Sequence, residues 1–304
     1  MRQAAKIALF TLLCLIWGST WLVIKVGYGD LGPFNVAAIR FLLAGLLFVP
    51  LVPAFRARWP RGRREWLLVL WVGAAMFTAD YGLIYWGEMR IDSGLTAVLF
   101  ATLPLSTAIL AHFFVPGDRL SPRKAGGVLL AFAGVVALFG DKLRIDPSKT
   151  WPMLAIVASA IFAAAAAIAS KRYGKDLHAT ALNAPAMIVG AILLSLVSLA
   201  TGDGLALPRD GPTWGAILYL AIAGSVVTFL VYFTLLKTWN VTSLSFISVF
   251  IPIVALALGY AFLGERPSVW TGLGAAMIIG GVTLANLAHR ARPPATAPVG
   301  KPDT

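Results

Sequence analysis

The sequence predicts an all-α polytopic membrane protein with ten transmembrane helices in two inverted five-helix repeats. Composition is the first observation: of 304 residues, 59% are hydrophobic and 12% charged. Soluble domains are roughly 45–50% apolar and about 25% charged. The chain therefore carries too little charge to cover a soluble surface. The other two observations are a series of long apolar runs and an internal repeat.

Ten apolar runs have the length that a membrane span requires, because about 20 residues of helix cross roughly 30 Å of hydrocarbon. They cover residues 6–28, 33–52, 66–86, 93–114, 124–140, 151–171, 179–201, 214–236, 242–263 and 269–288. The first run follows two basic residues but lacks a small-residue cleavage site, so we interpret it as a span rather than a signal peptide. The Pro-rich residues 289–304 are predicted to be a disordered cytoplasmic tail.

The net charge of +12 comes from basic residues in the short loops between these runs. With the N-terminus in the cytoplasm, seventeen of the 25 Lys and Arg residues fall in cytoplasmic segments and six in outside loops; Lys25 and Arg40 fall inside spans. This bias predicts that both termini are cytoplasmic. The exception is the loop after the fifth run, which has three basic residues on the outer side. No nucleic-acid partner is expected.

The two halves of the chain resemble each other. In "PLSTAILAHFFVPGDRLSPRKAGGVLLAFAGVV" (residues 104–136) and "PIVALALGYAFLGERPSVWTGLGAAMIIGGVT" (residues 252–283), Pro104 matches Pro252 and a G-acid-R-x-S unit recurs after a one-residue gap. Residues 1–140 and 151–288 are therefore predicted to be two repeats. Five spans per repeat is an odd number, so the second repeat is inverted, as in many secondary transporters.

Four segments together resemble the ten-span EamA-type permeases of the drug/metabolite transporter superfamily. They are "WGSTWLVIKVG", "AAIRFLLAGLL" and the two Pro-containing repeat segments. The resemblance implies a basket of ten helices around a central cavity, in a bacterial inner membrane, that exports small metabolites. Within the superfamily, the chain is most similar to amino-acid exporters of the YddG type. Phe162 departs from the pattern, because relatives often carry tryptophan there.

Pro104 and Pro252 point to the solute site, because interrupted spans in corresponding positions of two repeats mark the binding site of transporters. Both lie about ten residues into their spans, hence ~15 Å deep at 1.5 Å per residue. Each proline removes a backbone donor and frees a carbonyl four residues earlier, at Phe100 and Ser248. The prolines are interpreted as packing kinks, as hinges beside the cavity, or as both.

Arg40 and Asp80 are charged residues within predicted spans, where ionisable side chains normally face the bundle interior and find partners. Both are expected ~10 Å below the outer surface, so a buried Arg40–Asp80 pair is geometrically allowed. Two roles remain open: a structural lock between the second and third helices, or contact with solute or a coupling proton. Asp80 is the candidate proton site.

Aromatic residues supply the remaining candidates for the cavity wall. Trp17 is too deep for the aromatic interface belt and is expected to face protein or cavity. Lys25 lies near the outer interface and is predicted to be a snorkelling anchor. Tyr81 and Tyr85 share one helical face with Thr78, and Asp80 points away from parts of that face. The two tyrosines and Asp80 can therefore all line the cavity only if the cavity is wide. The predicted substrate-binding residues are Trp17, Arg40, Tyr81, Tyr85, Phe100, Phe162 and Ser248.

Several functions are weighed against export of amino acids, aromatic ones included, by alternating access. Enzyme chemistry is not expected, because no H-E-x-x-H pattern occurs and no histidine lies at the depth of the serine of "WGST". Scaffold or lipid-scramblase roles remain alternatives, as does proton-coupled efflux of lipophilic cationic drugs, with Asp80 and Trp17 as recognition groups. No G-x-x-x-x-G-K-[ST] loop occurs, so transport is expected to be secondary. One cysteine, Cys14, excludes a disulfide framework within the chain. No cofactor or metal is predicted, and the partners are lipid and solute, with the protein as a monomer.

Overall fold

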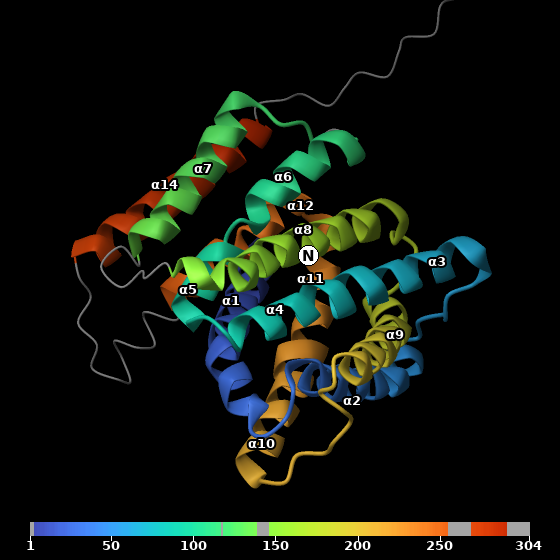
Figure 1. Ribbon diagram of the computed structural model, residues 1–304. Helices are drawn as coiled ribbons and strands as arrows, with labels where there is room; N and C mark the ends of the chain where they lie inside the picture. The colour runs from blue at the N-terminus through green and yellow to red at the C-terminus, as the bar shows by residue number, and fades with distance from the viewer. Residues whose placement is uncertain (1–2, 117, 139–145, 255–268, 291–304) are drawn as a thin grey trace, which may run out of the picture.

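The structure is a computed structural model that describes residues 3–116, 118–138, 146–254 and 269–290. All regular elements in these ranges are helical, and they form one bundle (Figure 1). The all-helical, polytopic fold predicted from the sequence is confirmed. Two predicted features lie outside the described residues: the tail beyond Arg290 and the second copy of the G-acid-R-x-S unit.

The first half contains five passes, of which the third and fourth are built from more than one helical segment. α3 and α4 flank a π-helical stretch at Gly73–Asp80, and α5 and α6 are separated by a break at residues 101–102. The helices are α1 (Gln3–Tyr28), α2 (Pro33–Ala54), α3 (Gly62–Val72), α4 (Tyr81–Glu88), α5 (Ser93–Phe100), α6 (Leu103–Phe114) and α7 (Pro122–Leu138).

The second half follows the same plan. A 3-10 turn at Pro147–Lys149 leads into it, and a π-helical stretch at Ile222–Val227 again interrupts its third pass. A turn at Phe246 breaks its fourth pass, after which residues 247–254 are helical. The helices are α8 (Thr150–Tyr173), α9 (Ala179–Ala200), α10 (Gly211–Ala221), α11 (Thr228–Thr238), α12 (Val241–Ser245) and α14 (Val269–Arg290).

Seven passes in the described ranges are at least 18 residues long and apolar enough to cross a membrane. Residues 122–138, 241–254 and 269–290 supply the helices of the other three predicted spans. Large apolar side chains such as Leu22, Leu196 and Ile279 stay more than half exposed, as expected where hydrocarbon surrounds the protein. The internal breaks in the fourth and ninth spans were not predicted as breaks.

The element boundaries repeat between the halves. The ends of α9 lie 146 positions after those of α2 (33 to 179 and 54 to 200). In the later passes the spacing is 148: α5 begins at residue 93 and α12 at 241, as Pro104 precedes Pro252. Both π-helical stretches obey the same spacing within one residue at each end. Local sequence thus encodes the same backbone plan twice.

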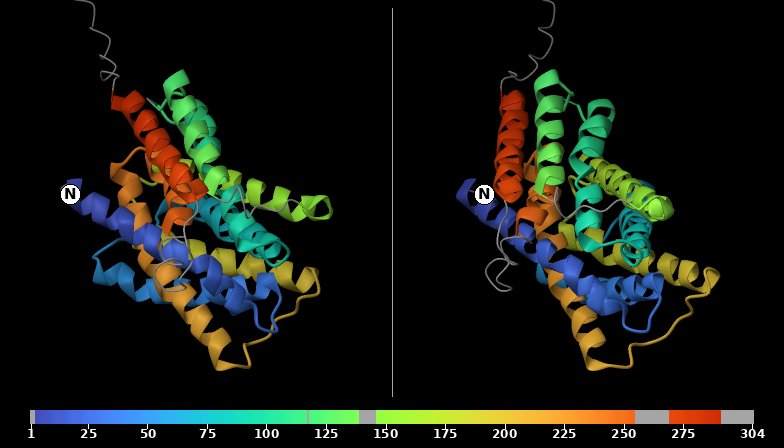
Figure 2. Two further views of the ribbon diagram at one scale, coloured as in Figure 1. Left: turned by 90° about the vertical axis from the view of Figure 1, so that its left-hand side faces the viewer. Right: turned by 60° about the vertical axis from the view of Figure 1, so that its left-hand side comes forward.

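Equivalent helices of the two halves pack against each other, α2 on α9 and α7 on α14 (Figure 2). Glycines make the α7–α14 contact possible. A Cβ at Gly134 would lie 2.7 Å from the Gly274 carbonyl oxygen, and one at Gly127 would lie 2.6 Å from that of Gly281. Such small-residue contacts allow helix backbones to approach closely in membranes. These four glycines are the ones that the repeat places in register.

Candidate functional site

A cavity with about 640 Å³ of empty space, part of it open to solvent, lies between the two halves. Asp80 is the one carboxylate in its described lining. Six of the lining side chains are aromatic: Trp17, Trp21, Tyr81, Phe100, Phe229 and Tyr232. The others are Thr20, Ile24, Met76, Ile84, Leu103, Ala163, Ile247 and Ile251.

The cavity follows the pseudo-symmetry of the fold. Tyr81 and Phe229 line it from positions 148 residues apart, as do Ile84 with Tyr232 and Leu103 with Ile251. The broken helices also meet here, because Phe100 and Leu103 flank the first break and Ile247 follows the second. A site at the interface of inverted repeats, beside discontinuous helices, is where secondary transporters bind their solutes.

The aromatic side chains pack in two groups, which together form the aromatic wall of the cavity. The Trp17 ring lies 5.6 Å from Phe229 and 5.6 Å from Tyr232, measured between ring centroids. Tyr81 lies 6.0 Å from Phe229, and Trp21 lies 5.8 Å from Phe100. Edge-to-face and tilted pairs at these separations are mutually stabilising. The wall can therefore keep its shape while offering ring faces to an apolar, aromatic or cationic group.

Asp80 is held in this wall by an irregular piece of helix. It ends the π-helical stretch Gly73–Asp80, is 3% exposed, and has a buried Oδ1 atom without a hydrogen-bond partner. The Arg40–Asp80 ion pair that matching depths allowed is not formed, and Asp80 has no ion-pair partner among the described residues. A buried carboxylate oxygen without a partner is costly, and π-helical turns are frequent at functional sites.

Arg40 lies behind the wall. Its Nε donates to Ser225 Oγ at 2.9 Å, its Nη1 to Tyr85 Oη at 3.1 Å and its Nη2 to the Gly224 carbonyl at 2.8 Å. The guanidinium also lies 4.8 Å from the centre of the Tyr81 ring. Gly224 and Ser225 belong to the second π-helical stretch, where regular backbone bonding is disturbed. Arg40 is fully buried and joins the two halves of the chain through these bonds.

Trp21 presents the second unpartnered polar group of the cavity. Its indole Nε1 is buried without an acceptor, although an indole N–H normally finds one when it is buried. Trp17, by contrast, donates to the Gly224 carbonyl at 3.4 Å. The described lining thus contains two buried polar atoms without a hydrogen-bond partner, an acceptor on Asp80 and a donor on Trp21.

The structure separates the predicted site residues into two groups. Trp17, Asp80, Tyr81 and Phe100 line the cavity. The other four predicted contacts do not: Arg40 and Tyr85 lie behind it, Phe162 is 38% exposed on the outside of α8, and Ser248 is buried with its hydroxyl on the Ser245 carbonyl at 3.0 Å. Pro104 is the second residue of α6, directly after the break, and Pro252 lies six residues after Phe246.

Three important side chains were missed in the sequence. Phe229 and Tyr232 line the cavity, and the position of Phe229 opposite Tyr81 in the repeat could have revealed it. Glu88, at the end of the third pass, is a further buried carboxylate, and its Oε2 has no hydrogen-bond partner. It was missed because the predicted third span ended at residue 86, whereas α4 continues to Glu88.

Comparison with known proteins identifies the family in which this architecture occurs. The profile of the EamA-like transporter family matches residues 5–140 and again 150–287. The chain is 31% identical over 284 residues to an uncharacterized transporter of Archaeoglobus fulgidus, covering 91% of this chain and 95% of that one. It is 28% identical to the uncharacterized inner membrane transporter YedA of Escherichia coli K12, covering 96% and 94%.

Two further similarities are more distant. The probable terminal-alkyne amino-acid exporter of Streptantibioticus cattleyicolor is 26% identical, over 94% of this chain and 95% of that one. A solved crystal structure of a protein superposes with a TM-score of 0.78 at 21% identity, over 95% of this chain and 99% of the other, which supports the fold alone. With two matches of the family profile and a relative above 30% identity, the chain belongs to the EamA-like transporter family.

Proposed function

We propose that this protein is a secondary exporter of small amine-bearing metabolites, amino acids with aromatic or apolar side chains among them, and that it works by alternating access. The observation that carries the proposal is the pair of unpartnered buried polar atoms, Asp80 Oδ1 and Trp21 Nε1, in an aromatic cavity between two repeats. Twofold repetition of the backbone provides two related arrangements, which alternating access requires.

The chemistry of the cavity selects the solute class. An ammonium group bound at Asp80 would neutralise the carboxylate and satisfy its free oxygen; charged hydrogen bonds of this kind contribute about 1.5–3 kcal/mol. Ring faces of Trp17, Tyr81 and Phe229 attract both cations and apolar groups. An acid with aromatic neighbours therefore suits a solute with an amine at one end and an apolar or aromatic group at the other.

Amino acids also need a donor for their carboxylate, and Trp21 Nε1 is a buried donor of the described lining without a hydrogen-bond partner. Arg40 was the expected carboxylate partner, but its three nitrogens already donate to Ser225, Tyr85 and Gly224. Support for amino acids comes also from the Streptantibioticus relative, which is named a probable amino-acid exporter.

A second candidate is efflux of lipophilic cations in exchange for protons. The same acid favours it, because no Lys or Arg side chain belongs to the described lining and a cation without a carboxylate would leave nothing unpaired except Trp21 Nε1. Release of the cation to one side would then be coupled to protonation of Asp80. The two candidates differ in whether the solute needs a carboxylate.

The proposal also includes the location of the protein in the cell and its orientation in the membrane. We place the protein in a bacterial inner membrane as a monomer with both termini in the cytoplasm. The bias of seventeen basic residues against six supports this orientation, and the inner-membrane relative YedA supports the location. In this orientation export moves solute from the side where α1 begins to the side where it ends.

The test is counterflow in proteoliposomes with three labelled probes: phenylalanine, phenethylamine and tetraphenylphosphonium, each with and without a pH gradient. Asp80→Asn should lower the affinity for the transported probe about tenfold or more, since tenfold corresponds to about 1.4 kcal/mol. Asp146→Asn, at an exposed residue outside the bundle, is the matched control. Transport of phenylalanine would support the first candidate and gradient-driven transport of tetraphenylphosphonium alone the second. Transport unaffected by Asp80→Asn, or of none of the three, would overturn the proposed solute class.

A further inference from the structure

Two lysines occupy equivalent positions in the two repeats. Lys25 lies near the end of α1 and Lys171 near the end of α8, and they are 146 positions apart, the spacing that separates α2 from α9. Lys25 was expected to be a snorkelling anchor at the interface. Its ammonium group instead points into the protein and binds backbone carbonyls.

The two ammonium groups bind equivalent carbonyls. Lys25 Nζ donates to the carbonyl oxygens of Glu88 at 2.7 Å and Ile91 at 3.0 Å. Lys171 Nζ donates to those of Leu236 at 2.6 Å and Trp239 at 2.7 Å. Residue 236 follows 88 by 148 positions, and 239 follows 91 by the same number. We name these two contacts the lysine clamps; they are one interaction made twice.

Each clamp closes the C-terminal end of a helix. α4 ends at Glu88 and α11 ends at Thr238, where the last carbonyls have no partners within the helix. A cation at this end satisfies these carbonyls and interacts favourably with the helix dipole. Each clamp therefore fastens the first helix of its repeat to the turn that enters the broken helix of the same repeat, at α5 or α12.

The clamps lie on opposite faces of the bundle. We call the side where α1 begins the N-terminal face and the side where it ends the distal face. Lys25 lies at the distal end of α1. Five passes later α8 runs the opposite way, so Lys171 lies on the N-terminal face, where the ring of Phe10 near the start of α1 packs 5.6 Å from the ring of Trp239. Each face thus has one clamp.

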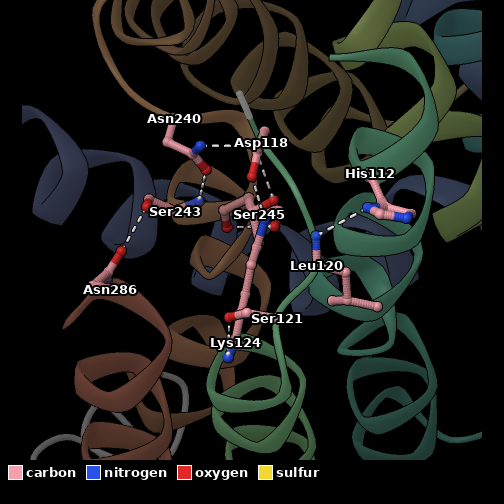
Figure 3. Close-up of polar contacts among 10 residues, drawn as sticks. His112, Asp118, Leu120, Ser121, Lys124, Asn240, Ser243, Ser245 and Asn286 are labelled. Atoms are coloured by element: carbon pink, nitrogen blue, oxygen red, sulfur yellow. Dashed lines mark hydrogen bonds and ion pairs between the residues drawn. The ribbon is translucent and has the colours of Figure 1, made fainter. Parts of the chain in front are cut away.

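A different contact joins the two halves on the N-terminal face. Asp118, from the first half, is buried and accepts from Asn240 Nδ2 at 2.7 Å and from Thr242 Oγ1 at 3.4 Å, both at the start of α12 (Figure 3). It also forms a buried ion pair with Lys124 of its own half. We name the Asp118–Asn240–Thr242 contact the inter-half lock. It holds the entrance of one broken helix to the loop that follows the other.

The two kinds of contact behave differently in an alternating cycle. Alternating access in inverted-repeat transporters is largely a rocking or gating of one repeat against the other. A contact that lies within one repeat is therefore kept during such a motion. The lysine clamps meet this condition. The inter-half lock spans the two parts that must separate before the cavity opens to the N-terminal face.

We propose that Lys25 and Lys171 are positioning residues of the transport cycle. Their hydrogen bonds persist in every state, so the first helix of each repeat moves together with the broken helix of the same repeat. The inter-half lock, a few residues away, is the contact that opens. This inference rests on the proposed transport function. It names the parts that move as units and the interface that separates.

Cross-linking tests this difference without a known solute. In a background with Cys14→Ala and a reporter Ala163→Cys in the cavity wall, labelling by a membrane-impermeant maleimide is measured from each face. Cysteine pairs replace Lys171 and Trp239 for the clamp, and Asp118 and Asn240 for the lock. They are joined by a reducible two-headed thiol reagent of matched length before the reporter is assayed. Single-cysteine variants treated with the reagent are the controls.

The joined clamp should leave the reporter accessible from both faces, whereas the joined lock should abolish labelling from the N-terminal face until a reductant is added. If joining the clamp also abolishes labelling from one face, the clamp opens during the cycle and the proposal is wrong. Labelling from both faces without transport of any probe would instead count against the proposed solute class alone.

Loss of the clamp has a kinetic consequence. Lys171→Met and Lys25→Met should each lower the turnover rate about tenfold while the dissociation constant of the solute stays within about twofold, because neither lysine touches the cavity. Lys171→Arg, which keeps charge and donors, should restore most of the rate. Equal losses of affinity and rate, or no rescue by arginine, would show that the lysines only support folding.

Discussion

Replacing Arg40 with methionine separates two roles that the sequence leaves open, binding of a solute carboxylate and structural joining of the halves. The side chain donates three hydrogen bonds of 2.8–3.1 Å to Ser225, Tyr85 and Gly224. At about 1.5 kcal/mol each, the lower limit for charged groups, they contribute about 4.5 kcal/mol. Removing the charge from the span recovers about 3 kcal/mol. The net loss of folding stability is therefore about 1.5 kcal/mol.

Lysine at this position should be worse than methionine. A lysine retains the cost of a buried charge, but its compact ammonium group cannot reach three acceptors that surround a planar guanidinium. The expected order of stability is wild type, then Arg40→Met, then Arg40→Lys. This order is the opposite of what conservation of charge suggests, so it tests whether the hydrogen-bond geometry or the charge matters.

The assay is thermal unfolding in detergent together with equilibrium binding of the transported probe. With about 2.1 cal/mol/K of unfolding entropy per residue, 1.5 kcal/mol in a chain of 304 residues lowers the melting temperature by about 2–3 °C, which is the loss expected for Arg40→Met. The dissociation constant should stay within about threefold, because Arg40 does not line the cavity. An unchanged melting temperature with a tenfold loss of binding would refute this reasoning and return Arg40 to the solute site.

Three further predictions follow from single contacts. Trp21→Phe removes an unpartnered buried N–H and leaves a smaller aromatic ring, so relief of the N–H offsets lost packing and thermal stability should change little while affinity for amino acids falls several-fold; equal affinity for phenethylamine is the check. Gly281→Ala brings a Cβ to 2.5 Å from backbone atoms of α7 and should cost about 1–3 kcal/mol, whereas Gly272→Ala on the same helix meets nothing within 4 Å and should be neutral in thermal unfolding. Asp118→Asn should cost about 3–5 kcal/mol because it leaves the Lys124 ammonium buried without its partner, and the double change Asp118→Leu with Lys124→Met should restore much of that stability in the same assay.

The fold could be predicted well because the features that indicate it can be counted along the sequence. Span length, basic loops and a repeat with fixed spacing depend on order along the chain, and the lipid environment allows few alternatives to helices. Pro104 and Pro252 correctly indicated which passes are interrupted. The breaks themselves were not predicted, because the chain turns at residues 101–102 and at Phe246, ahead of each proline.

Prediction of the site was weaker. The depth of a residue in the membrane follows from counting along its span, but the direction in which its side chain points around the helix does not. Asp80 and Tyr81 were expected to face apart unless the cavity was wide, yet both line it. The π-helical stretch that ends at Asp80 has more residues per turn than an α-helix, so it changes the direction of every side chain after it. Tyr85 consequently faces Arg40 rather than the cavity. Nothing in the local sequence marks that shift of phase.

The side chains of the cavity break the symmetry that its backbone keeps. Asp80 has Thr228 at the equivalent position 148 residues later, and Trp17 has Ala163 at its equivalent position 146 residues later. The repeated backbone supplies two related conformations, but the carboxylate is supplied by one half alone in the described lining. Two acids facing each other would offer two cation sites or share a proton, whereas a single acid binds one ammonium group at a time. If the proposed function holds, one amine per conformational cycle is the stoichiometry that this cavity favours, and the second half would serve to move that site between the two faces.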